Sequence, residues 1–267
     1  PGPAGQGPTG KGPIGKGPAP PAGEVAGEAQ FRHDLLLLLL RYKGLGGSGF
    51  QAALGGGAHE ALRSGFGCQL ECFASPLNAR SAPFCSGFAD VDAPFGSIGS
   101  FFDFHPMTGS FQANPPFVPP LVTAMVAHMR SLLDAADRRR APLLFATVVG
   151  ASAAMRRSAA WQALLNLASS AHGRAHWDIP LHRHGYTDGH AHISTEAARM
   201  SSCPSAVFIF ATTAAHAAFP PTSDKEAAVR AGMQLAVPRN LHKASKANRR
   251  VHLQKKKRKR KRLLSAT

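Results

Sequence analysis

GSFQANPPF, residues Gly109–Phe117, indicates the fold class more clearly than any other part of the chain. Its first five residues are typical of a short strand, and its two prolines end that strand because proline has no backbone N–H to donate to a sheet. Apolar residues then recur at helical spacing between Leu121 and Leu133. Further strands are predicted at Pro142–Val149 and Ala206–Phe210. The order of strand, helix and strand favours an α/β fold built on a parallel sheet.

The residues before this stretch predict a mixture of helices and loops. Helices are expected at Glu28–Tyr42 and at Phe50–Leu62, although three consecutive glycines weaken the second. Gly67–Ala74 is a short apolar run that suits a buried strand. Phe84–Gly109 is rich in Gly, Ser, Asp and Phe and is expected to form loops around short strands. The chain therefore approaches its central strand through irregular structure.

Composition predicts three regions. Residues 1–27 are a Gly- and Pro-rich arm whose glycines lack the strict three-residue period of collagen, so the arm is expected to be disordered. Residues 28–235 are expected to form one domain, and residues 236–267 a basic, disordered tail. Thirteen Lys and Arg residues and no acidic residue lie between Arg239 and Arg262, which leaves 18 basic and 15 acidic residues elsewhere. Most of the +16 net charge, and with it the attraction to polyanions, belongs to the tail.

Neither the cysteines nor the leucines predict an extracellular or membrane protein. The four cysteines lack paired metal-ligand spacing and are expected to be buried free thiols: Cys68, Cys72, Cys85 and Cys203. The run Leu35–Leu40 is far shorter than the roughly 20 apolar residues that span a bilayer. We expect a soluble intracellular protein without a membrane partner.

The chemistry is predicted to centre on Asn114, Pro115, Pro116 and Phe117. An exocyclic aromatic amine is a poor nucleophile, because its lone pair is delocalised into the ring. The Asn114 side-chain oxygen and the Pro115 carbonyl can accept its two hydrogens, while Phe117 stacks on the base. A simple Pro-Pro turn after a strand is the alternative. Similar tetrapeptides also serve enzymes that methylate guanine amino groups or protein glutamines.

Longer stretches carry a resemblance to one family. LECFASPLN (Leu70–Asn78), the segment Phe84–Phe117 and the helix containing AMVAHM (Ala124–Met129) are similar to the phosphorylated-CTD-interacting factor family, the cap-specific adenosine N6-methyltransferases. The resemblance implies a Rossmann-like, S-adenosylmethionine-dependent core. It implies a methyl acceptor at N6 of the 2′-O-methyladenosine beside the 7-methylguanosine cap of mRNA. It also implies action in the nucleus alongside the phosphorylated C-terminal domain of RNA polymerase II. Asn114 to Phe117 become the catalytic, donor-adjacent motif.

The resemblance also assigns residues to the methyl donor. Glu71, Ser75 and Asn78 lie at the end of the first predicted strand, where such folds receive the methionine or ribose part of the donor. Asp90 and Asp92 are alternatives for the ribose hydroxyls, unless they belong to a solvated loop.

Three residues beyond Phe117 are candidates for contact with the capped RNA. His184 and Tyr186 fall in HRHGYTDGHAH, which resembles a family segment. Trp161 stands later than the family's tryptophan and is either an aromatic platform for the cap or base, or a core residue of a helix.

Four histidines in the same segment suggest a zinc cluster when taken alone: His182, His184, His190 and His192. The family uses no metal, so none is expected here. Contact with RNA or donor, and a solvated polar loop, are the other interpretations.

Two alternatives to a cap methyltransferase stay open. The family's WW module and helical RNA-binding portion are expected upstream, where this chain has low-complexity sequence. That low-complexity sequence favours one alternative, an inactive RNA-binding fragment of the family. The other alternative is an enzyme acting on another planar nitrogen, in rRNA or a protein glutamine. The eight consecutive cations of Lys255–Arg262 predict nuclear import or nonspecific RNA contact.

Overall fold

A computed structural model describes residues 22–45, 52–188 and 198–234. The chain divides into two compact units, Pro1–Gly46 and Gly47–Thr267. The first unit contains α1 (Ala22–Gly44), which confirms the predicted helix and extends it at both ends. The predicted domain began at residue 28, whereas the structure assigns α1 to a unit separate from the sheet. The predicted disordered arm and basic tail lie almost wholly outside the described residues.

Within the described residues, no helix is both long enough and apolar enough to cross a bilayer. All four cysteines are free. Cys68, Cys72 and Cys85 are buried as expected, whereas Cys203 is only partly buried.

The second unit is organised around a five-stranded mixed sheet, which confirms the α/β, Rossmann-like class. The strand order is β2-β3-β4-β8-β5. The bounds are β2 (Leu70–Glu71), β3 (Gly109–Ala113), β4 (Leu143–Gly150), β5 (Gly173–Ile179) and β8 (Ser205–Ala211).

The predicted parallel sheet is correct for part of these strands. β2, β3 and β4 are parallel, but β8 runs antiparallel between β4 and β5. All residues of β8 are buried. A continuous apolar run predicts a buried strand without indicating its direction, because side chains alternate identically in both orientations.

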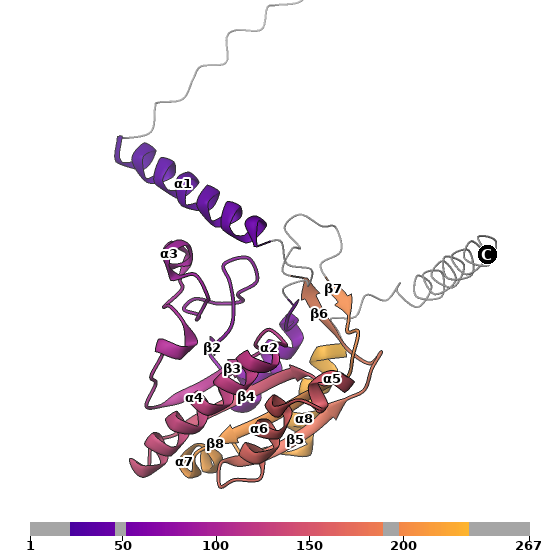
Figure 1. Cartoon of the computed structure of the whole chain (residues 1–267). Helices are drawn as coiled ribbons and strands as arrows, with labels where there is room; N and C mark the ends of the chain where they lie inside the picture. The colour runs from indigo at the N-terminus through magenta and orange to yellow at the C-terminus, as the bar shows by residue number, and fades with distance from the viewer. Residues whose placement is uncertain (1–21, 46–51, 189–197, 235–267) are drawn as a thin grey trace, which may run out of the picture. The chain divides into compact units, whose positions relative to one another are not determined.

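Helices cover both faces of this sheet (Figure 1). α4 (Pro119–Arg138) and α6 (Ala159–Ala168) pack on one face, and α2 (Gly56–Phe66) and α8 (Ser223–Gln234) on the other. The helical stripe predicted for α4 is confirmed by its buried residues: Val122, Met125, Val126, Met129, Leu132, Leu133 and Ala136. Two shorter helices are α5 (Ala153–Arg156) and α7 (Thr213–Ala218).

A second sheet corrects the helix predicted at Phe50–Leu62. β1 (Ala52–Ala53), β6 (Gly185–Asp188) and β7 (Ala198–Met200) form three antiparallel strands in the order β1-β6-β7. The helix, α2, begins only at Gly56. Glycine is a poor helix former, so the residues before it are available to pair with β6.

The strand predicted at Gly67–Ala74 is shorter than expected. Regular pairing is limited to β2, and Ala74 makes an isolated bridge to Ser86. The following segment is irregular as predicted, with three short helices: α3 (Ala89–Asp92), η1 (Ala93–Phe95) and η2 (Phe101–Asp103). These connections leave the carboxyl ends of β2 and β3 beside each other, where open α/β sheets bind ligands.

Candidate active site

Asn114 is held at the carboxyl end of β3, as the sequence predicts. Its side chain is buried, and its amide Nδ2 donates a hydrogen bond of 2.9 Å to the carbonyl oxygen of Ala52 in β1. This bond determines the orientation of the amide, because the opposite rotamer would set two carbonyl oxygens against each other. The buried Oδ1 atom of Asn114 has no hydrogen-bond partner among the described residues.

An unpaired, buried acceptor is informative about function. Leaving such a group unsatisfied costs about 1–3 kcal/mol, so native proteins rarely retain one without a ligand or a chemical role. An N–H donor placed at Asn114 Oδ1 would remove this penalty. The residues present therefore fit a substrate that carries an amino group.

The rest of the tetrapeptide forms a tight turn into α4. Pro115 is buried and Pro116 is exposed. The Pro116 carbonyl accepts the N–H of Val118 at 2.7 Å. Pro116 is therefore already engaged within the turn, and the Pro115 carbonyl is the one that the predicted amine clamp uses.

Phe117 lies between the two hydrophobic cores and is partly buried. Its ring packs on the backbone of Gly150 at the end of β4 and contacts the Tyr186 ring edge-on, with the centroids 6.0 Å apart. The Phe117 ring is therefore held in one place, three residues after Asn114, as a stacking surface for a flat base requires.

Behind Phe117 lies a buried hydrogen-bond network. Ser205 Oγ is 2.5 Å from the Tyr186 hydroxyl and 2.7 Å from His184 Nε2. His184 Nδ1 lies 3.1 Å from the Pro180 carbonyl, so Nδ1 carries the hydrogen and donates, and Nε2 accepts from Ser205. Burial lowers the pKa of His184 and raises that of Tyr186.

His184 and Tyr186, two of the predicted contacts with the substrate, are therefore buried and already bonded within the protein. Their polar atoms bond to Ser205, and the Tyr186 ring supports Phe117. Direct contact with RNA stays a prediction for both. Ser205 was missed because a lone serine at the start of an apolar strand carries no sequence signal.

The three predicted donor residues lie together at the end of β2 and in the turn that follows. Glu71 is buried, and its Oε1 accepts the backbone N–H of Arg80 at 2.6 Å. Hydrogen bonds between Ser75 and Asn78 close the turn. The Ser75 backbone N–H and hydroxyl both donate to Asn78 Oδ1, at 2.8 and 3.2 Å. Ser75 and Asn78 thus shape the loop, while Glu71 faces a pocket.

This pocket has a volume of about 220 Å³ and lies between α2, β2 and β3. Its lining residues are Gly56, His59, Glu60, Arg63, Cys68, Gln69, Leu70, Glu71, Arg80, Ser81 and Gln112. Sequence reasoning missed His59 and Gln112. The one available signal for Gln112 was its polar side chain within a strand, two residues before Asn114.

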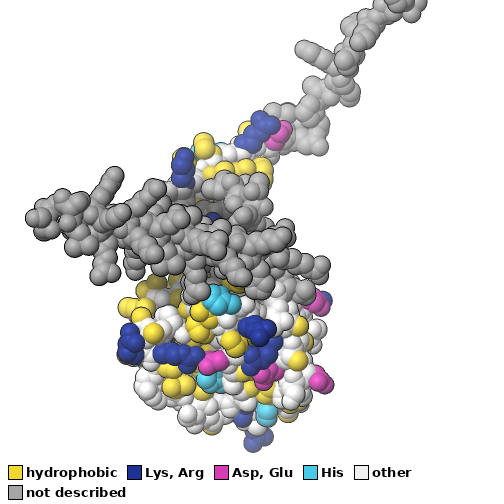
Figure 2. Space-filling model, turned by 90° about the vertical axis from the view of Figure 1, so that its right-hand side faces the viewer, with side chains coloured by type: hydrophobic (Ala, Val, Ile, Leu, Met, Phe, Trp, Pro, Cys, Tyr) yellow, Lys and Arg dark blue, Asp and Glu magenta, His cyan; other side chains and the backbone are white. Residues whose placement is uncertain are grey.

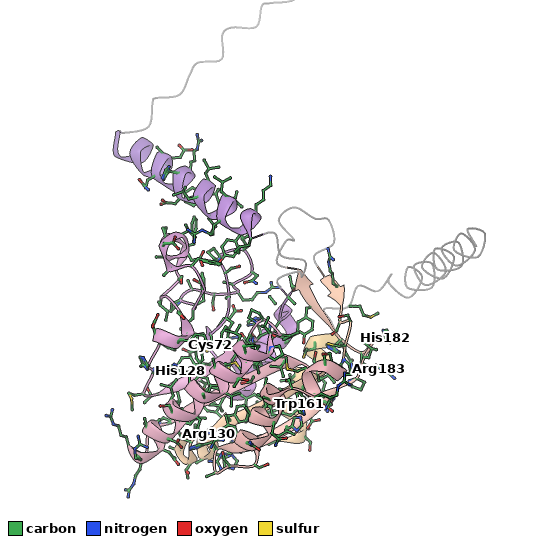
Figure 3. The ribbon with its side chains drawn as sticks, viewed as in Figure 1. Cys72, His128, Arg130, Trp161, His182 and Arg183 are labelled. Carbon is green, nitrogen blue, oxygen red and sulfur yellow. The ribbon has the colours of Figure 1, made fainter. Side chains whose placement is uncertain are left out.

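Trp161 lies on α6 in the core (Figure 3). Its ring packs edge-on against Phe208, with the ring centroids 5.8 Å apart, and the Arg156 Cζ atom lies 4.5 Å from the Trp161 ring centroid. Only 6% of Trp161 is exposed. This placement corresponds to a core tryptophan, the second of the two interpretations. A contact with the cap would require the ring to be uncovered and stays a prediction.

The remaining polar candidates do not converge. Asp90 is exposed and Asp92 is buried on α3. His182, with Arg183, lies at the periphery of the sheet unit (Figure 3), whereas His184 is buried. His190 and His192 lie outside the described residues.

Of the residues that the structure describes, no three His, Cys, Asp or Glu side chains are grouped as metal ligands. The visible part of the face in Figure 2 carries basic side chains interspersed with acidic ones. Two of the ion pairs of the sheet unit are Arg156–Asp178 and Arg230–Glu226.

Comparisons with known proteins show which family the chain resembles. The family model described as "Phosphorylated CTD interacting factor 1 WW domain" matches residues 23–189. In this chain those residues include nearly all of α1 and most of the sheet that carries Asn114.

Two curated relatives are both named mRNA (2′-O-methyladenosine-N(6)-)-methyltransferase. The one from Homo sapiens is 40% identical over 162 residues, and the one from Mus musculus 39%. Each alignment covers 58% of this chain and 22% of the relative, so the chain spans about a fifth of the length of the curated relatives it matches. The family match covers more than half of the chain, and the chain belongs to the phosphorylated CTD interacting factor 1 family.

Proposed function

We propose that this chain carries the methyl-transfer site of an mRNA cap adenosine N6-methyltransferase. The reaction moves a methyl group from S-adenosylmethionine to N6 of the 2′-O-methyladenosine beside the 7-methylguanosine cap. The observation that carries the proposal is the buried, unpaired Oδ1 of Asn114, whose amide is anchored to Ala52. The names of the two curated relatives support the choice of substrate.

The chain's own residues would act by positioning and by polarising the amine. Asn114 Oδ1 and the Pro115 carbonyl accept the two N6 hydrogens, which draws the nitrogen toward tetrahedral geometry. Phe117 stacks on the adenine and keeps N6 in line with the donor. S-adenosylmethionine supplies the methyl on a sulfonium leaving group. The Asn114 and Pro115 oxygens would hold the two N6 hydrogens, one of which would be lost to solvent as a proton when N6 is methylated.

The partners and location are part of the same proposal. Capped mRNA is the substrate, and the family description, which refers to a phosphorylated CTD, supports an interaction with RNA polymerase II. The mRNA substrate and the interaction with RNA polymerase II both imply a nuclear protein. The cationic run Lys255–Arg262 suits nuclear import or salt-sensitive binding to RNA phosphates.

A transfer assay with labelled donor tests the proposal. The full chain is incubated with capped RNA starting in 2′-O-methyladenosine, and with the same RNA lacking the cap. We expect label on N6 of the capped RNA alone.

Asn114→Ala should abolish transfer while thermal unfolding stays cooperative, and Asn166→Ala, at an exposed position on α6, serves as the matched control. Label on uncapped rRNA or on glutamine peptides would favour a different planar nitrogen. Full transfer by Asn114→Ala would refute the amine clamp.

A further inference from the structure

The strand β6 supports both halves of the tetrapeptide. Its Tyr186 ring contacts the Phe117 ring edge-on, with the centroids 6.0 Å apart. The same strand pairs with β1 at Ala52, whose carbonyl oxygen accepts the hydrogen bond from the Asn114 amide at 2.9 Å. One strand therefore stands behind both the amine-accepting side chain and the stacking ring.

The position of the Ala52 carbonyl depends on β6. β1 consists of Ala52 and Ala53, and within the described residues β6 is the one strand with which it pairs. A strand of two residues forms too few hydrogen bonds to hold its place by itself. β6 is therefore needed to keep the acceptor of the Asn114 amide where it is.

Side chains connect β6 to the larger sheet. In the part of the chain that the structure describes, β6 pairs with β1 and β7 and with no strand of the five-stranded sheet (Figure 1). At the surface, Arg80 Nη2 donates to Thr187 Oγ1 at 3.0 Å. In the interior, Ser205, the first residue of β8, bonds to Tyr186. The interior bond is the stronger connection, because water does not compete for it.

Ser205 holds β6 through a directed chain of hydrogen bonds. Its Oγ atom lies 2.5 Å from the Tyr186 hydroxyl and 2.7 Å from His184 Nε2, and all three side chains are buried. Because His184 Nδ1 donates to the Pro180 carbonyl, Nε2 accepts from Ser205, and Ser205 in turn accepts from Tyr186. Each hydroxyl thus donates one hydrogen bond, and the chain is complete without water.

The Ser205 backbone lies next to the surface that carries Phe117. Ser205 is paired with Gly150 across β8 and β4, and the Phe117 ring packs on Gly150. The backbone of Ser205 therefore fixes the strand end beneath the ring, while its hydroxyl fixes Tyr186 at the edge of the ring.

From these contacts we infer that Ser205 is a positioning residue for methyl transfer. Its hydroxyl fixes β6, and β6 sets the Asn114 amide through Ala52. The same strand sets the Phe117 ring through Tyr186. Ser205 is fully buried and acts through these residues without touching the substrate. This inference rests on the proposed roles of Asn114 and Phe117.

Steady-state kinetics of the full chain with capped RNA test the inference. Ser205→Ala breaks both hydrogen bonds without adding atoms, so kcat should fall about tenfold or more, as expected when a reacting group is misplaced. The KM for S-adenosylmethionine should equal that of wild type. Thr212→Val is the matched control, because it also removes a fully buried hydroxyl, just beyond the other end of β8. This control should lower the melting temperature without changing kcat.

Nuclear magnetic resonance measures the orientation of the Asn114 amide without turnover. With isotope label on the asparagine nitrogens, the Asn114 side-chain signals are those that Asn114→Ala removes. Ser205→Ala should shift these signals toward the position of the exposed Asn166, whereas Thr212→Val should leave them in place. Tyr186→Phe breaks the same chain of bonds, keeps the ring, and replaces Ser205→Ala if that variant does not fold.

Three results would overturn the inference. They are unchanged Asn114 signals in Ser205→Ala, an equal loss of kcat in Ser205→Ala and Thr212→Val, and a raised KM for the donor with unchanged kcat. Shifted Asn114 signals in Ser205→Ala, combined with a wild-type chain that transfers no methyl group, would instead refute the proposed function. The positioning of the Asn114 amide by Ser205 would then still stand.

Discussion

The Phe117 ring packs so closely on Gly150 that a Cβ atom at Gly150 would lie 2.5 Å from Phe117 Cδ2. Gly150 ends β4, directly opposite Ser205 of β8. One packed layer is therefore formed by Phe117, the end of β4 and the buried hydrogen-bond network of Ser205, His184 and Tyr186.

Gly150→Ala should move the Phe117 ring away from its position over the end of β4. We expect methyl transfer to fall at least tenfold, with a loss of stability of about 1–3 kcal/mol from overpacking. The transfer assay and urea unfolding measure the two effects. Gly87→Ala is the control and should behave as wild type, because a methyl group at Gly87 would meet no other atom within 4 Å.

Phe117→Ala should weaken binding of the acceptor RNA. Stacking of a base on an aromatic ring contributes about 1–3 kcal/mol, so a fluorescence titration with capped RNA should show a loss of roughly five- to 150-fold. Phe117→Tyr, which keeps the ring, should retain most of the affinity. Equal binding by Phe117→Ala and wild type would contradict stacking at this position.

Asn114→Asp should be more damaging to stability than its similar shape suggests. The aspartate has no N–H to donate to the Ala52 carbonyl, so two oxygens would oppose each other in a buried setting. We expect a destabilisation of about 1–3 kcal/mol in urea unfolding. Stability equal to wild type would show that the bond to Ala52 does not anchor the side chain.

Acid should destabilise the folded chain through His184. Burial lowers the pKa of His184 below its ordinary value of 6.5, so below about pH 6.5 the unfolded chain binds a proton that the folded chain does not. The free energy of unfolding is therefore at its full value above pH 6.5 and falls as the pH drops toward the folded pKa. His176 has a pKa shifted in the same direction and adds to the effect.

Urea unfolding at pH 7.5 and 5.5 measures this dependence. His184→Gln should show a smaller loss of stability between the two pH values than wild type. His182→Gln, at an exposed position two residues away, should leave the loss unchanged.

The buried thiols should be unreactive in the folded chain. Burial raises the pKa of Cys68 and Cys85 to about 12, and that of Cys72 well above its ordinary value. Since the thiolate is the reactive form, a disulfide reagent at pH 8 should modify these three only after unfolding in urea. Rapid modification of all four cysteines in the native chain would show that the β2 region opens readily.

Local sequence patterns predicted the elements that surround the site. The apolar spacing of α4 predicted its buried face, and the prolines after Ala113 predicted where β3 ends. The same patterns were less accurate near Gly55 and Gly67, where short strands depend on pairing with distant residues. A two-residue strand such as β1 has no periodicity of its own and forms because β6 pairs with it.

The order of amino acids was enough to predict that Asn114 follows a short strand, that an aromatic residue stands three positions later, and which family the chain resembles. It took the folded arrangement to show that Ala52, 62 residues away, orients the Asn114 amide, that β8 runs antiparallel, and that Gln112 faces a pocket with Glu71 and His59. The difference arises because hydrophobic period and turn residues are local properties of the chain. The partner of a hydrogen bond and the lining of a cavity are determined by which distant segments the folded core brings together.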